Sequence, residues 1–74
     1  MTLKDLQIGD KVKIVGVNGE KAIKRRMLDM GITRGTEVML RKKAPLQDPI
    51  QIHVRGYELT LRLKDANNVI VEKI

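Results

Sequence analysis

Short segments of alternating apolar and polar residues constrain the fold of this chain more than any other feature. They lie at residues 11–17, 37–43, 50–54, 57–63 and 69–74. An alternation with a period of two predicts β-strands that place one face against a core. An open sheet of five strands would leave two unprotected edges, whereas a barrel removes them. We therefore expect residues 1–74 to form a single, mainly β domain, built as a small five-stranded barrel.

The core of this barrel must be almost wholly aliphatic. The chain contains no Trp and no Phe, and Tyr57 is its one aromatic residue. This shortage of rings argues against RNA-binding modules that stack bases on exposed aromatic side chains. The chain also contains no Cys, which excludes disulfides, thiolate metal sites and cysteine nucleophiles. The alternation assigns these side chains to the interior: Val12, Ile14, Val38, Leu40, Ile50, Ile52, Val54, Tyr57, Leu59, Leu61 and Leu63.

One helix interrupts the strands. Residues 20–30 predict a short amphipathic helix inserted after the first strand, with Ile23, Met27 and Met30 as its buried stripe. Gly31 follows directly, and a glycine just past a helix end adopts the left-handed conformation without a steric penalty. We expect this glycine corner to fix how the helix lies on the sheet.

The net charge of +6 is concentrated in one part of the chain. Residues 21–43 hold eight basic and two acidic residues, while the remainder is balanced. A basic face predicts an acidic partner, such as nucleic acid, lipid headgroups or an acidic protein surface, or it simply keeps the surface solvated. Leu28 lies about 140° around the helix from the buried stripe, among these charges. It is either an exposed docking residue, a leucine covered by a loop, or an isolated surface leucine.

No pattern in the chain is typical of a catalytic site. There is no serine, and the single histidine, His53, alternates onto the outer face of its strand. With Glu58 across the predicted hairpin it is a weak metal candidate, and a solvated histidine is the commoner situation. Gly31 and Gly35 resemble a phosphate loop, but no Lys-Ser/Thr pair follows them. We therefore expect a protein that is not an enzyme and has no resident cofactor, with ferrous iron as a weak candidate ligand.

Several stretches resemble the FeoA family, small cytoplasmic proteins of the bacterial ferrous iron uptake system. The run RMLDMGITRGTEV at residues 26–38 is similar to the family signature. Residues 44–50 are similar to its proline-containing loop, and residues 56–62 to the strand that follows. Ala66 with residues 69–71 is similar to its closing segment, and Leu3, Leu6 and Gly9 match its lead-in. The resemblance therefore spans nearly the whole chain.

Two residues depart from the family pattern. Arg34 stands where the family often has proline, so the turn is expected to be less rigid. Gln47 stands where glycine is common, so the loop around it is expected to follow a different path. No apolar run approaches the roughly 20 residues needed to cross a bilayer, and no signal peptide is recognisable.

The resemblance implies an SH3-like barrel and a cytoplasmic accessory protein. Its implied partner is the FeoB membrane transporter, bound through that protein's cytoplasmic G domain, without insertion into the membrane. FeoA-like modules also form the C-terminal domains of iron-dependent repressors, so a metal-responsive module is one alternative, and a small basic barrel that binds nucleic acid is another. Combined with the charge and exposure arguments, the expected partner-binding residues are Lys21, Lys24, Arg25, Leu28 and Arg34.

Overall fold

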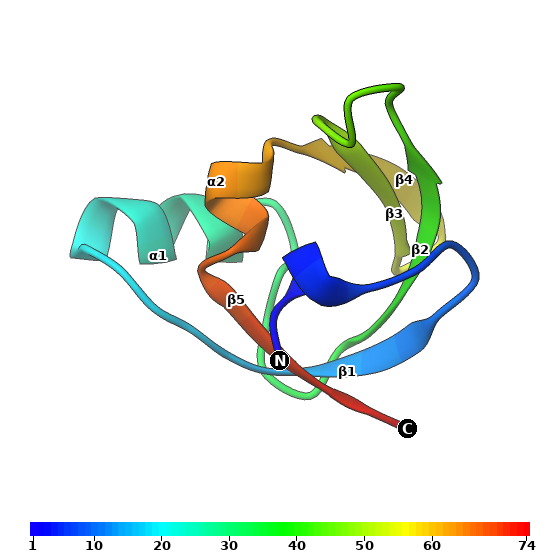
Figure 1. The fold of residues 1–74 in the computed structure, drawn as a ribbon. Helices are drawn as coiled ribbons and strands as arrows, with labels where there is room; N and C mark the ends of the chain where they lie inside the picture. The colour runs from blue at the N-terminus through cyan, green and yellow to red at the C-terminus, as the bar shows by residue number, and fades with distance from the viewer.

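The computed structural model describes residues 1–74 and contains five strands, one principal helix and two short helical turns (Figure 1). In chain order the elements are η1 (Leu3–Asp5), β1 (Lys11–Val17), α1 (Lys21–Asp29), β2 (Glu37–Lys43), β3 (Ile50–Val54), β4 (Tyr57–Leu61), α2 (Leu63–Ala66) and β5 (Val69–Lys73). All strand pairs are antiparallel, in the order β4-β3-β2-β1-β5. The mainly β class and the helix after the first strand are thus confirmed.

The strongly curved sheet does not close into a cylinder through hydrogen bonds alone. Its two edge strands, β4 and β5, form no ladder with each other. Instead, α2 carries the chain from one to the other, and η1 contacts both α2 and β5 (Figure 1). Leu3, Leu6 and Ala66 are completely buried or nearly so. The barrel is therefore completed by helical turns and side chains where we expected continuous strand pairing.

The core is entirely apolar, as predicted, with fifteen buried residues that are all Leu, Ile, Val, Met or Ala. Every predicted inward side chain of β1, β2 and β3 is buried. In the fourth strand, Leu61 is buried and Leu59 is partly buried. The prediction fails for Tyr57, which is 41% exposed. It is the first residue of β4, and its hydroxyl donates to the backbone carbonyl of Met30.

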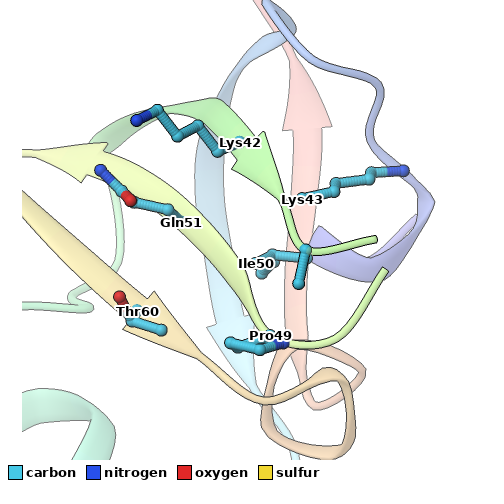
Figure 2. Close-up of a pocket in the computed structure, with 7 residues that line it drawn as sticks. Lys42, Lys43, Pro49, Ile50, Gln51 and Thr60 are labelled. Carbon is cyan, nitrogen blue, oxygen red and sulfur yellow. The ribbon is translucent and has the colours of Figure 1, made fainter. Parts of the chain in front are cut away.

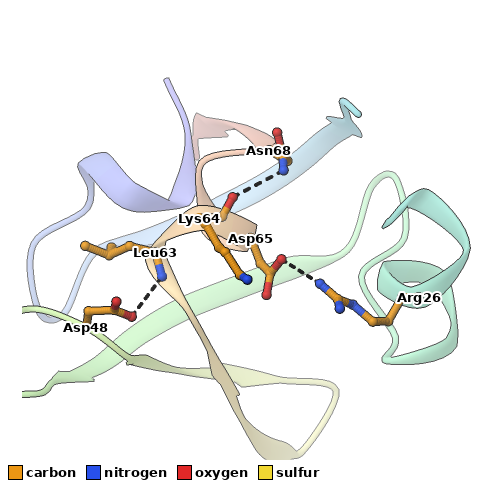
Figure 3. A network of polar contacts seen from close by, with 6 residues as sticks. All are labelled: Arg26, Asp48, Leu63, Lys64, Asp65 and Asn68. Carbon is orange, nitrogen blue, oxygen red and sulfur yellow. Dashed lines mark hydrogen bonds and ion pairs between the residues drawn. The ribbon is translucent and has the colours of Figure 1, made fainter. Parts of the chain in front are cut away.

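The fourth strand is also shorter than the alternation predicted. It ends at Leu61, and Leu63 begins α2. The reason is a side-chain cap from another segment: the carboxylate of Asp48 accepts the amide of Leu63 at 3.0 Å (Figure 3). Such an acceptor supports the first turn of a helix, and it comes from a loop that local periodicity does not reveal.

The helix α1 packs as an amphipathic element. Met27 is completely buried, while Ile23 and Met30 are partly buried and pack against the core. The predicted stripe therefore faces the core, but only one of its three residues is completely buried. Leu28, on the other side, is 56% exposed, so the alternative of a covering loop is wrong.

Candidate docking surface

The end of α1 is a Schellman motif. Gly31 has a φ of 92° and donates its amide to Leu28, while Ile32 donates its amide to the carbonyl of Met27 at 2.9 Å. Ile32 and Met27 are both completely buried, which is the apolar contact that usually accompanies this cap. The motif therefore turns the chain directly after the last turn of α1, which carries the exposed Leu28.

The corner that follows is tied to the middle of β1. The amide of Gly35 donates to the carbonyl of Ile14 at 2.8 Å, and the amide of Ile14 donates to Thr36 at 2.9 Å. The pairing of β1 with β5 skips one residue between Ile14 and Gly16, which is the signature of a β-bulge. These contacts bring the exposed Arg34 next to the end of β1.

The structure gathers three of the five predicted partner-binding residues around one hollow. Lys24, Leu28 and Arg34 line a hollow of 180 Å³ together with Gly16, Val17 and Ile32. All five predicted residues are exposed. The other two, Lys21 and Arg25, line a separate hollow on α1 with Asp29 among its walls. The predicted surface is thus one helix face with two distinct hollows.

The four cations of this surface take part in no ion pair. The neighbouring Arg26 behaves differently, because its guanidinium lies 2.6 Å from the carboxylate of Asp65 and so ties α1 to α2 (Figure 3). The remaining carboxylate pairs involve Lys11, Arg41, His53 and Arg62. Lys21, Lys24, Arg25 and Arg34 are therefore available to an acidic partner.

Two residues that the sequence reasoning missed brace this corner from the β3–β4 hairpin. Arg55 donates from Nη2 to the hydroxyl of Thr33 at 3.0 Å and lies 3.4 Å from that of Thr36. Tyr57 donates to the carbonyl of Met30. Arg55 has a φ of 50°, an uncommon conformation for a residue with a side chain. In the sequence, the one sign of these contacts is the single aromatic residue, Tyr57, next to the Arg55-Gly56 turn. This sign does not indicate that the two side chains contact the corner after α1.

The basic residues of the 21–43 stretch do not form one face, contrary to our expectation. The end of β2 lies at the opposite side of the molecule from α1 (Figure 1). There Lys42 and Lys43 line a different hollow of 240 Å³ with Gln51 and Thr60 (Figure 2), and Arg41 lies 3.4 Å from Glu58. The chain reverses between the two groups of charges, so proximity in sequence does not produce proximity in space.

The two weak metal candidates are neighbours across the β3–β4 hairpin. Nδ1 of His53 lies 3.3 Å from the carboxylate of Glu58, and the two residues are register partners. This nitrogen makes no hydrogen bond, so the geometry of the contact does not meet that of a hydrogen bond although the two atoms are close. Arg41 shares the same carboxylate, and no group of three or more His, Cys, Asp or Glu gathers anywhere in the structure. Two ligands and a competing cation form a poor metal site.

Comparison with known families gives a match over almost the entire chain. Residues 1–73 match the model described as the FeoA domain. This chain belongs to the FeoA family. The FeoA-like protein of Clostridium acetobutylicum is 42% identical to it over the whole chain and 86% of its own length, with a TM-score of 0.93.

Three further proteins are similar to this chain in sequence or in fold. FeoA of Stenotrophomonas maltophilia, described as a prokaryotic SH3 domain protein complexed with zinc, is 29% identical over 97% of this chain and 89% of its own, with a TM-score of 0.83. The SH3-like class is thus confirmed. A curated FeoA–FeoB fusion protein of Porphyromonas gingivalis is 36% identical over the whole chain. This chain spans only 9% of the fusion's length. A manganese-dependent repressor at 13% identity and a TM-score of 0.90 shares the fold alone.

The helices of the structure are short. The longest, α1, has nine residues, and none has the length and apolar character needed to cross a bilayer.

Proposed function

We propose that this FeoA domain is a cytoplasmic accessory module of ferrous iron uptake that docks on the G domain of a FeoB-type transporter and modulates it. The docking surface is the exposed face of α1 with the corner after it: Lys21, Lys24, Arg25, Leu28 and Arg34. The observation that carries this proposal is the combination of an exposed leucine with four cations that have no acidic partner within the chain.

The choice of partner rests on the relatives. In the P. gingivalis fusion protein an FeoA-like segment and FeoB are parts of one chain. A covalent link keeps two modules at high effective concentration, which favours contact between them. The S. maltophilia relative is described as a possible activating factor of ferrous iron transport, which supports a role beside the transporter.

The surface itself resembles a small interface anchor. An exposed apolar side chain that becomes buried between partners supplies affinity, while charges around it set encounter rate and specificity. Because Leu28 is 56% exposed, replacing it should leave the fold intact. Replacing Leu28 should therefore lower the affinity for the partner and leave the free energy of unfolding unchanged.

The test is co-purification with the soluble G domain of a FeoB-type transporter. The wild-type chain should retain the G domain, and Leu28→Asp should lose it while keeping its unfolding midpoint. The matched control is Lys42→Ala, an exposed cation outside this surface. Equal retention by wild type and Leu28→Asp would exclude this surface.

Nucleic-acid binding remains the competing proposal, and the division of the basic residues between α1 and the end of β2 weakens it. Binding through phosphate contacts would depend steeply on salt. Failure to bind random DNA or RNA at low salt would eliminate it.

A further inference from the structure

One hollow in the proposed docking surface combines an apolar lining with two cations. It lies between the end of β1 and α1 and measures 180 Å³. Val17 and Leu28 supply its accessible apolar wall, and the third apolar lining residue, Ile32, is completely buried. Lys24 and Arg34 supply its two charges. That this surface is a docking site rests on the proposed function above. Which kind of side chain it binds is argued from the residues that line the hollow.

The size of the hollow suits a side chain better than a cofactor or a metabolite. Pockets that hold cofactors or metabolites measure about 300–1,000 Å³. A volume of 180 Å³ therefore suits one aliphatic side chain. Covering the exposed wall formed by Leu28 would remove apolar surface from water, which is favourable.

The charges select an acidic segment as the carrier of that side chain. No carboxylate lines the hollow, and neither Lys24 nor Arg34 has an acidic partner in the chain. We propose that the hollow binds an aliphatic side chain of an acidic protein segment, whose flanking carboxylates meet Lys24 and Arg34.

Gly16 lines the hollow and contributes no side chain to it. A Cβ added to Gly16 would meet no atom within 4 Å, and its backbone does not adopt the left-handed conformation. A side chain at this position is therefore compatible with the fold, and we expect it to narrow the hollow because Gly16 is one of the lining residues. Gly16→Val is the variant that narrows the hollow without removing a native contact.

The experiment is an NMR titration of the ¹⁵N-labelled chain with three peptides. The first is acetyl-Asp-Glu-Leu-Glu-Asp-amide, the second replaces its Leu with Ser, and the third is acetyl-Lys-Lys-Leu-Lys-Lys-amide. The first should shift the amides of Val17, Leu28 and Ile32 and bind at least about tenfold more tightly than the other two. Equal affinities, shifts confined to other residues, or no binding of the first peptide would overturn the proposal.

Variants separate the apolar part of the site from its charges. Gly16→Val should weaken the first peptide by about tenfold without lowering the unfolding midpoint. Lys24→Ala and Arg34→Ala should weaken it and reduce its salt dependence, because each removes one cation from the rim. Lys42→Ala should change nothing. Unaltered binding by Gly16→Val would contradict the assignment of the hollow.

The same variant distinguishes this inference from the proposed function. If Leu28→Asp abolishes binding of the G domain and Gly16→Val does not, the surface is correct and the hollow is not its anchor. If the acidic peptide binds in the hollow and the G domain does not bind at all, the inference holds and the proposed partner is wrong.

Discussion

The hydroxyl of Tyr57 donates a hydrogen bond to the backbone carbonyl of Met30, and so joins the start of β4 to the C-terminal end of α1. Carbonyls at the end of a helix lack partners within the helix and are satisfied by such donors. The contact therefore connects the hairpin to the corner that carries the docking surface.

Removing this hydroxyl should destabilise the protein modestly. Tyr57→Phe leaves the ring in place and deprives the Met30 carbonyl of its donor, so we expect a loss of about 0.5–1.5 kcal/mol in the free energy of unfolding. Chemical denaturation measures it. Thr60→Ala, on the same strand with no side-chain hydrogen bond, is the control. A Tyr57→Phe protein as stable as wild type would show that water replaces the contact.

Adjacent residues on α1 should respond very differently to truncation. Met27 is completely buried and Leu28 is 56% exposed. Met27→Ala should cost about 2–5 kcal/mol because it leaves a cavity, whereas Leu28→Ala should change stability by less than about 0.5 kcal/mol. Thermal or urea unfolding of both variants checks this. Similar losses in the two would mean that Leu28 is covered in solution.

Gln47→Gly should stabilise the loop between β2 and β3. Gln47 has a φ of 65°, a conformation that disfavours residues with a Cβ, so glycine should gain about 0.5 kcal/mol after its own entropic cost. Gln47→Ala keeps the Cβ and should show no gain. A loss of stability on Gln47→Gly would contradict the strain argument.

Because of its ion pair with α2, Arg26 of α1 should contribute to the free energy of unfolding, whereas Arg25 should not. Arg26 lies 2.6 Å from Asp65, whose side chain is 15% exposed, while Arg25 has no acidic partner. Arg26→Ala should cost about 0.5–1 kcal/mol, near the upper end for a pair that solvent partly screens. Arg25→Ala should leave the unfolding free energy unchanged. Equal effects would mean that the pair contributes nothing measurable.

Asp5 should contribute to stability in a pH-dependent way. Its carboxylate accepts the amide of Thr2 at 2.9 Å, and this hydrogen bond, helped by the charges of Lys4 and the N-terminus, lowers the pKa of Asp5 below its ordinary value of 3.8. A lowered folded-state pKa means that the contribution is present above 3.8 and disappears as the pH falls through the folded-state pKa. Asp5→Asn should therefore be less stable than wild type at neutral pH and equal to it in strong acid. Thermal unfolding across this range checks it, and a constant difference would exclude the linkage.

Local patterns predicted the parts of the structure that depend on neighbouring residues. The strand faces, the glycine end of α1 and the position of Leu28 away from the buried stripe all follow from period and turn chemistry. Gln47 was expected to redirect its loop because it replaces a common glycine, and yet it adopts the left-handed backbone that glycine favours. The backbone there is set by the surrounding fold.

Contacts between distant segments were not predictable in the same way. Tyr57 reaches a carbonyl 27 residues away, and Asp48 caps a helix that begins at Leu63. The periodicity of the sequence indicates neither contact. The same holds for the division of the basic residues between α1 and the end of β2, because it depends on how the chain reverses in space. All five residues of the candidate surface are exposed in the structure, and its division into two hollows was not predictable from the sequence.

The most direct test of the docking surface is an NMR titration of the ¹⁵N-labelled chain with the unlabelled G domain of a FeoB-type transporter. We expect the largest changes in the amide signals at Lys24, Leu28 and Arg34, with none at Lys42 or Thr60. Changes concentrated on β2, β3 and β4, with the α1 signals unaltered, would contradict it.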